Sequence, residues 1–372
     1  MIRICLCFLM LILIFPLSGC WGIKEIQGQL FVTELGIDYK QGEYVVYFQI
    51  LSFKSVAKTE AGGESPSDSQ VNLGIAKGET IHEAFSNVQK SSQIPLYFGH
   101  IKTVYLTESI IKRHMKEALS FLGRNIYMRH ATWLYAVQGE LKDILLAQSL
   151  FDSSPIYTFT YRPEEMLASN SFIPVNSLRT FVSRYYEPVG STMIPTVTID
   201  KSSWRDKKEK KKLLTISGAY FFSNQEFKGW LKEENLKGMN WFNTKLKRMN
   251  MNVRKKKISV QIIHSSTKIQ VLKGSSPKFI IVVKTHAILE ENNNHLPLSV
   301  VKQALQRQIK SDINESFQKG LTINADILNL SEKSYRFHYK NWSELELKYL
   351  TKESIADIQV KIHIENSADY KS

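Results

Sequence analysis

The sequence predicts a multi-domain protein of mixed α/β class (α+β), with helices packed on mixed or antiparallel sheets. Two observations favour this class. In the first half of the 372 residues, strand-like segments alternate with segments whose apolar residues recur at helical spacing. In the second half, several β-branched segments precede one long amphipathic helix. The hydrophobic fraction of 43% is high enough for extensive cores.

The first half begins with two predicted strands, residues 30–38 and 43–53, joined by a turn at residues 39–42. Apolar residues occupy both alternating faces of the second strand, so we expect both faces of its sheet to be covered. Residues 57–70 contain few apolar side chains and are rich in Gly, Ser and acidic residues. This composition predicts an exposed loop.

A helix is predicted after a capping box formed by Thr80 and Glu83. Ile81, Ala84 and Phe85 fall at helical spacing, so this helix should pack on the preceding strands. The remaining elements of this half are predicted as a strand at 101–106, a helix capped by Thr107 and closed by Gly123, a strand at 131–137, helices at 141–150 and 177–186, and a strand at 193–199.

One basic segment, residues 205–212, suggests where the chain divides. It reads Arg-Asp-Lys-Lys-Glu-Lys-Lys-Lys, which is typical of a solvated surface loop or, alternatively, of a contact with a membrane or polymer. The predicted parts are a cleaved lipoprotein signal peptide (1–19), an N-terminal α/β domain (20–200), a basic linker (201–212) and a C-terminal α+β domain (213–372), with a split into three domains left open.

The second half is predicted as α+β with an antiparallel sheet. A hairpin at 213–222 and 226–231 comes first, and residues 236–246 are helical or turn-like. Further strands are predicted at 257–264, 268–272, 278–289 and 358–364. A long helix between the last two, closed by Gly320, carries one apolar seam formed by Leu298, Val301, Leu305, Ile309, Ile313 and Phe317.

The start of the chain predicts export and a lipid anchor. A helix over the apolar run that ends at Leu17 would reach about 21 Å, which is short of the hydrocarbon core of about 30 Å. The run ends in Leu17-Ser18-Gly19-Cys20, which is typical of a lipobox. We expect Cys20 to become the mature N-terminus and to carry an S-diacylglyceryl group, with additional N-acylation left open. The alternatives are an ordinary secretory leader with a chance Cys, or an uncleaved anchor.

Cysteine usage limits the chemistry of the mature chain. The three cysteines are Cys5, Cys7 and Cys20, and the first two leave with the leader. Acylation of Cys20 would then exclude an internal disulfide, a Cys-ligated zinc site and a thiol nucleophile. The formal charge of +14 suits an anionic membrane surface or an acidic polymer, without choosing between them.

The sequence contains no motif that indicates catalysis. Nucleotide-binding glycine loops, the nucleophile elbow and the zinc-protease motif are missing, and no two of the nine histidines are spaced i, i+4 on a predicted helix. We therefore predict no enzyme activity, no catalytic or metal-ligating residues, no cofactor and no nucleic-acid partner.

Several segments together resemble the C subunits of spore germinant receptors, the Ger(x)C lipoproteins. The usual start of the mature family members is C-W-D-x-x-E-I, and Gly22 stands here where Asp is usual. The matching segments are Cys20-Trp21, Lys24-Glu25-Ile26, residues 32–38 (VTELGID), 78–84 (GETIHEA), 96–102 (LYFGHIK), 218–222 (GAYFF) and 227–231 (FKGWL), together with Asp326 and Trp342.

This resemblance implies a non-catalytic, lipid-anchored subunit of a germinant receptor on the outer face of the inner spore membrane. It also implies two integral-membrane partners, the A and B subunits, a response to nutrient germinants, and a multi-domain α/β fold without cofactor. The alternative is an independent solute- or polymer-binding lipoprotein, which should show two similar lobes around a cleft. The role of residues 207–212 stays open.

We predict that Cys20 is the lipid-modified N-terminus of the mature chain, because the lipobox follows an apolar run too short to span a bilayer. Mass spectrometry of the N-terminal peptide from spore membranes should detect a diacylglyceryl Cys20. Detection of an intact Met1 or of an unmodified Cys20 would contradict the prediction.

Overall fold

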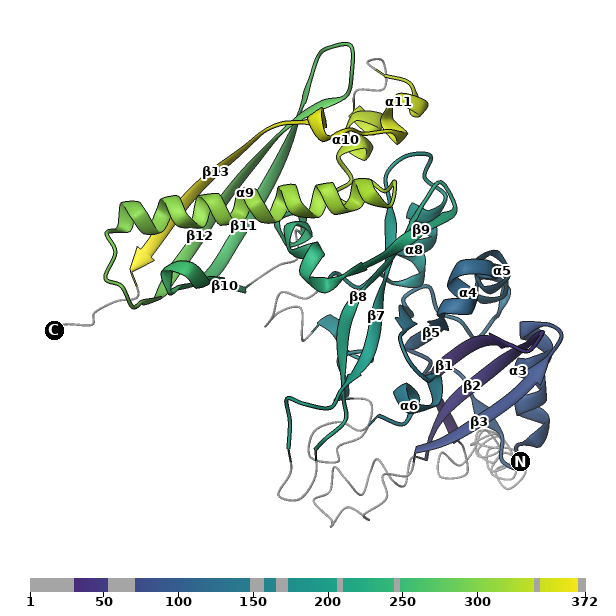
Figure 1. The fold of residues 1–372 in the computed structure, drawn as a ribbon. Helices are drawn as coiled ribbons and strands as arrows, with labels where there is room; N and C mark the ends of the chain where they lie inside the picture. The colour runs from purple at the N-terminus through teal and green to yellow at the C-terminus, as the bar shows by residue number, and fades with distance from the viewer. Residues whose placement is uncertain are drawn as a thin grey trace, which may run out of the picture.

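The described residues form two mixed sheets, each packed with helices, in the computed structural model (Figure 1). The expected leader, Cys20, the segment 21–29, the loop 57–70 and the linker residues 206–209 lie outside the described residues. The structure describes residues 30–52, 71–147, 157–164, 173–205, 210–243, 248–337 and 342–366.

The first sheet has nine strands and combines parallel and antiparallel pairs. Strands β1, β5, β6 and β7 run parallel to one another, and the outer pairs are antiparallel. In spatial order the strands are β3 (Val71–Gly78), β2 (Glu43–Ser52), β1 (Leu30–Lys40), β5 (Thr103–Thr107), β6 (Trp133–Val137), β7 (Thr192–Asp200), β8 (Leu213–Ser223) and β9 (Glu226–Lys232), with β4 (Leu96–Tyr97) also beside β1.

Helices cover both faces of this sheet, as the pattern of the second strand predicts. Val46 and Phe48 join the core under α3, α4, α5 and α8, whereas Val45 and Tyr47 join a smaller core under α6. These helices are α3 (Ile81–Ser91), α4 (Glu108–Arg113), α5 (Met115–Arg124), α6 (Leu141–Leu145) and α8 (Leu178–Tyr185).

The helix predicted between Thr107 and Gly123 is divided into α4 and α5 at His114. The imidazole of His114 lies against the ring of Tyr39, with 4.0 Å between ring centroids, and is hydrogen-bonded to the hydroxyl of Tyr44 at 3.1 Å. These contacts hold His114 out of helical conformation (φ −127°), so the prediction of one helix is wrong. Gly123 lies inside α5, which ends at Arg124 with Asn125 as its C-cap.

The second sheet has four strands, and its last pair is parallel. This finding corrects the expected antiparallel sheet: α9 carries the chain back along β12, so the returning β13 runs in the same direction as β12. The two strands predicted within 257–272 form one strand, and β10 was not predicted. The strands are β10 (Met249–Val253), β11 (Ile258–Leu272), β12 (Lys278–Asn292) and β13 (Ile355–Asn366).

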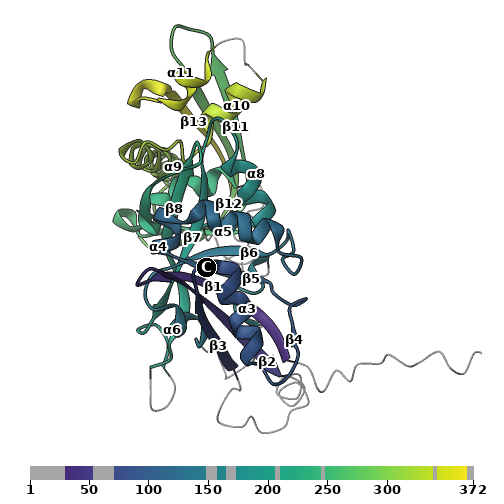
Figure 2. The ribbon, with the colours of Figure 1, turned by 90° about the vertical axis from the view of Figure 1, so that its right-hand side faces the viewer.

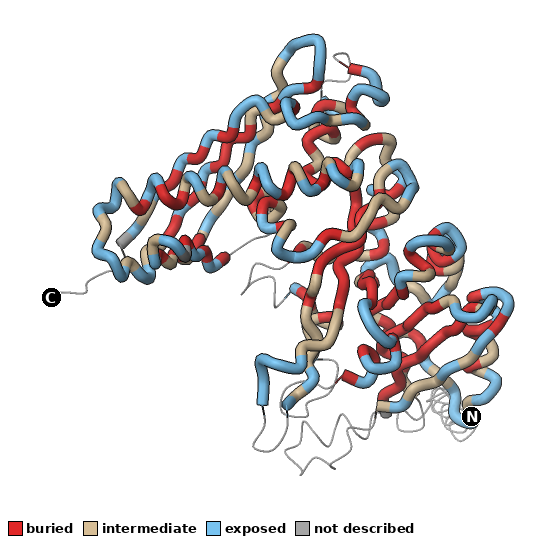
Figure 3. Tube along the Cα trace, viewed as in Figure 1, coloured by how far each residue is buried: buried red, intermediate tan, exposed pale blue. Residues whose placement is uncertain are grey.

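The long helix α9 (Leu298–Thr322) lies against one face of the second sheet (Figures 1 and 2). Its predicted seam is buried from Val301 to Phe317, whereas Leu298 at its start is exposed. Buried and exposed positions alternate along this helix (Figure 3). Short 3₁₀ helices and two short α-helices complete this part. They are η5 (Glu233–Phe242), η6 (Arg254–Lys256), α10 (Leu330–Phe337), α11 (Glu344–Lys348) and η7 (Lys352–Ser354).

Strands β8 and β9 follow the predicted linker 201–212 but belong to the first sheet. The elements from η5 onward build the second sheet and its helices. The division of the chain at 201–212 therefore stays a prediction, and hydrogen bonding between strands continues across it.

We predict that Ile309→Ala, at the centre of α9, lowers the free energy of unfolding by about 2–5 kcal/mol because it leaves a cavity in the core. Ile309 is 0% exposed, whereas the neighbouring Lys310 is exposed. Lys310→Ala should change stability by less than about 0.5 kcal/mol. Denaturant unfolding of the full chain, followed by circular dichroism, compares the two variants; equal effects would contradict this packing.

Candidate functional site

The two sheets meet where the loop after α8 contacts the segment that leads into α10. The backbone N–H of Ser191 donates a 2.6 Å hydrogen bond to Oδ1 of Asn329. Nη2 of Arg336 on α10 lies 2.8 Å from Oε1 of Glu187. One hydrogen bond and one ion pair thus connect the loop 186–191 to the C-terminal helices.

A small apolar cluster completes this junction. Val189, Trp342 and Leu347 are buried against one another, although they come from distant parts of the sequence. Gly190 between the polar and apolar contacts has φ +85°, and a Cβ there would stand 2.8 Å from Oδ1 of Asn329. Glycine is therefore required both by the backbone conformation and by the close approach.

Asp326 and Trp342 belong to the residues that carry the family resemblance, and both make contacts that stabilise the fold. Oδ2 of Asp326 accepts hydrogen bonds from the backbone N–H of Ser331 at 2.8 Å and from its hydroxyl at 2.6 Å. Burial raises the pKa of Asp326. Asp326 thereby fixes the start of α10, and Trp342 packs in the apolar cluster of the junction.

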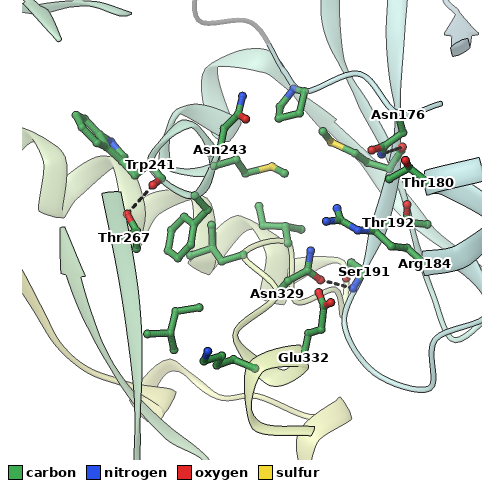
Figure 4. Close-up of a pocket in the computed structure, with 18 of the residues that line it drawn as sticks. Asn176, Thr180, Arg184, Ser191, Thr192, Trp241, Asn243, Thr267, Asn329 and Glu332 are labelled. Carbon is green, nitrogen blue, oxygen red and sulfur yellow. Dashed lines mark hydrogen bonds between the residues drawn. The ribbon is translucent and has the colours of Figure 1, made fainter. Parts of the chain in front are cut away.

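A cavity of about 480 Å³ lies beside this junction, with walls from both halves of the chain (Figure 4). We call it the junction cavity. Met193 on β7 and Phe221 on β8, which are paired in the sheet, form part of one wall. Further lining residues include Trp133, Asn176, Thr192, Phe242, Thr267 and Asn329.

Two charged side chains of opposite sign line the junction cavity. Arg184 on α8 points into it, and Glu332 on α10 lies beside Asn329 on the same side of the view (Figure 4). Glu332 is 2.9 Å from Nη2 of Arg336. Arg184 has no ion pair with any carboxylate in the part of the chain that the structure describes.

Several polar atoms in the walls are buried without a hydrogen-bond partner among the described residues. They are the hydroxyls of Ser191, Thr192 and Ser265 and the indole N–H of Trp241. Buried polar groups are normally paired, and each unpaired group costs about 1–3 kcal/mol. These atoms lie just behind the surface of the junction cavity, where a side-chain rotation would turn them toward a ligand.

The first family-like segment, residues 32–38, contains two carboxylates that the fold itself uses. Glu34 is fully buried and accepts a 3.1 Å hydrogen bond from the hydroxyl of Tyr105; burial raises the pKa of Glu34 to about 8. Asp38 accepts a 2.6 Å hydrogen bond from the hydroxyl of Thr107, and its Oδ2 lies 3.0 Å from Nζ of Lys40.

A row of three histidines on the second sheet was missed by the sequence reasoning. His264, His286 and His363 lie in register on β11, β12 and β13, with ring centroids 6.1 and 5.3 Å apart, and all three are exposed. Helical spacing could not find them, because the strand register joins positions far apart in sequence. Within the described ranges, no group of three or more His, Cys, Asp or Glu residues could hold a metal ion.

Cys20, the predicted lipidation site, lies outside the described residues, and the first described residue after it is Leu30 at the start of β1. No helix in the described part of the chain is long and apolar enough to cross a membrane. The long helix α9 has charged residues along its exposed side.

Two protein-family profiles match the chain. The profile described as "Spore germination protein N-terminal domain" matches residues 22–199. The profile described as "Spore germination B3/ GerAC like, C-terminal" matches residues 217–368. The predicted linker, residues 201–212, falls between the two matches.

Similar proteins cover nearly the whole chain. "Spore germination protein KC" of Bacillus subtilis (strain 168) is 22% identical over 396 residues, which cover 98% of this chain and 95% of that protein. "Spore germination protein B3" of the same strain is 26% identical over 312 residues, covering 80% and 78%. The solved structure "Crystal Structure of the GerBC protein" matches with a TM-score of 0.53 and 18% identity, covering 90% of this chain and 96% of that one, which shows a shared fold.

We predict that Glu34 makes stability fall as the pH rises. The pKa is 4.5 for an ordinary Glu and about 8 in the folded state, so between these values the folded protein holds a proton that the unfolded chain has released. The free energy of unfolding should decrease by up to about 1.4 kcal/mol per pH unit in this window. Unfolding of the full chain at pH 5 to 8 should show a flatter dependence for Glu34→Gln. The exposed control Glu365→Gln should keep the wild-type slope, and an unchanged slope in Glu34→Gln would contradict the prediction.

Proposed function

This chain belongs to the GerAC-like family of spore germination proteins, and we propose from this that it is a non-catalytic, lipid-anchored subunit of a germinant receptor complex. The observation that carries the proposal is the pair of family matches, which together span residues 22–199 and 217–368 directly after a lipobox. The complex responds to nutrient germinants and triggers spore germination.

The anchor is the diacylglyceryl group on Cys20. Two acyl chains are about what stable membrane attachment requires. Nine residues, 21–29, separate Cys20 from the start of β1. A fully extended chain of this length reaches about 30 Å, so the first sheet stays close to the outer face of the inner spore membrane.

The partners are two integral-membrane subunits of the A and B type. Attachment to the same membrane raises the effective concentration of this subunit for them without any new contact. The support for a non-catalytic role is that Glu34, Asp38 and Asp326 hold the fold together through hydrogen bonds and ion pairs. Each carboxylate has at least one partner within the protein, and Oδ1 of Asp326 has none among the described residues.

The alternative function is that of an independent solute- or polymer-binding lipoprotein, and the junction cavity favours it. A two-lobed solute binder, however, places its ligand between two similar lobes. Here one half contains a nine-stranded sheet and the other a four-stranded sheet with a 25-residue helix. This difference favours the receptor subunit.

We predict that Cys20→Ala strongly reduces nutrient-triggered germination, because the protein then leaves the membrane and meets its partners less often. Overproduction of this variant should recover part of the response. The measurement compares germination and membrane-fraction blots for wild-type spores, Cys20→Ala spores and spores without the protein.

Cys7→Ala is the matched control, because this change also removes a cysteine of the leader region but keeps the lipobox. These spores should germinate as the wild type does. Normal germination of Cys20→Ala spores whose membranes lack the protein would contradict the role of the anchor.

A further inference from the structure

We propose that the junction cavity binds a small molecule that carries a carboxylate group, with Arg184 as the residue that recognises the carboxylate. This inference goes beyond the proposed function, because it concerns a ligand of this chain and does not depend on lipid attachment. Three features of the cavity support this assignment: its size, the guanidinium of Arg184, and nearby buried hydroxyls without hydrogen-bond partners.

The cavity has the dimensions and walls of a small-molecule site. Its volume of about 480 Å³ lies within the range of about 300–1,000 Å³ that is typical of such sites. Trp133 and Phe242 provide apolar surface from the two halves of the chain, and Asn176, Thr180 and Asn329 provide polar groups. An apolar wall with a few polar groups suits an organic molecule better than a bare ion.

Arg184 is a cation at this cavity that no carboxylate among the described residues holds. Of the other two lining cations, Arg336 is held by Glu187 at 2.8 Å and Glu332 at 2.9 Å, and Nζ of Lys333 lies 4.1 Å from the ring centroid of Phe337. Arg184 pairs with no carboxylate among the described residues and extends into the cavity (Figure 4). A guanidinium group binds a carboxylate through two parallel hydrogen bonds, and this geometry specifies the carboxylate.

The wall that carries Arg184 also holds hydroxyls without partners. Oγ of Ser191 and Oγ1 of Thr192 are buried and accept or donate no hydrogen bond within the described ranges. Rotation about one side-chain bond redirects each hydroxyl. A ligand seated on Arg184 would offer acceptors to this wall and remove the cost of leaving the hydroxyls unpaired.

A carboxylate that lines the cavity restricts the rest of the ligand. Glu332 faces the cavity from α10, and it would repel a second carboxylate. The site should therefore prefer molecules with one carboxylate and a neutral or cationic remainder. Since the two walls come from different halves, such a ligand would also add contacts across the junction.

The test uses the full chain in detergent micelles and two matched pairs of probes. Benzoate and L-phenylalanine carry the carboxylate, and benzamide and L-phenylalaninamide replace it by an amide of similar shape. Titration followed by ligand-observed NMR should give saturable binding of at least one acid at about 1 mM or tighter. The corresponding amide should bind about tenfold more weakly, because it lacks the charge-assisted pair.

Two variants of α8 assign the binding to the cavity. Arg184→Gln should lose about tenfold or more in affinity for the acid, whereas Arg179→Gln should bind like the wild type. Arg179 is an exposed arginine on the same helix that does not line the cavity. The pair therefore controls for net charge and for any change in the helix itself.

Three outcomes would overturn the inference. They are equal binding of acids and amides, equal affinity in Arg184→Gln and the wild type, and no binding of either acid up to about 10 mM. The last result is the one expected if the cavity receives a polypeptide segment of a partner subunit instead. None of these outcomes bears on the Cys20 comparison, so failure of this inference and failure of the receptor proposal are distinguishable.

Discussion

The antiparallel pairing of β7 with β8 is the constraint on which the arrangement of the whole chain depends. β7 closes the parallel part of the first sheet, and β8 starts the route through β9 and η5 to the second sheet. A strand cannot turn relative to its partner without breaking the row of hydrogen bonds between them. This pairing fixes where the chain leaves the first sheet, and the hydrogen bond from Ser191 to Asn329 attaches the second half a second time. The junction cavity is the space left between these two attachments, and the paired Met193 and Phe221 line it.

Elements with local signals were predictable from the sequence. The hydroxyl of Thr80 accepts a hydrogen bond from the backbone N–H of Glu83, as the predicted capping box requires. The β8–β9 hairpin forms around the turn predicted between its two strands. Elements decided by distant contacts were not predictable. The break at His114 depends on two tyrosines far away in sequence, and the direction of β13 depends on where α9 delivers the chain.

The candidate site was harder to predict than the fold, for a related reason. The residues of the junction cavity come from five or more separate segments of the sequence. None of these segments contains a motif that indicates a binding site. In the sequence, Arg184 resembles any other arginine on the surface of a short helix. Only the fold brings residues of the second half to the same cavity. The histidine row across β11, β12 and β13 is likewise visible only in the strand register.

Three of the carboxylates in the segments that carry the family resemblance make hydrogen bonds that stabilise the fold. Glu34 and Asp38 connect β1 to β5 and to the turn before α4, and Asp326 orders the start of α10. Burying a carboxylate costs less free energy when hydrogen bonds satisfy it, so loss of these partners should destabilise the fold. The hydrogen bonds of these three carboxylates give each of them a role in the fold.

The position of β1 within the first sheet also determines how the protein bears load. β1 begins at Leu30 and has neighbours on both sides, β2 on one and β4 and β5 on the other. Tension applied to the chain before Leu30 runs along the strand, whereas the hydrogen bonds run across it. The hydrogen bonds to β2 and those to β5 are then loaded together in shear. An edge strand that is pulled away sideways would instead lose its hydrogen bonds one at a time. A pull on the amino-terminal end would therefore move the body as a unit before it unravels the sheet.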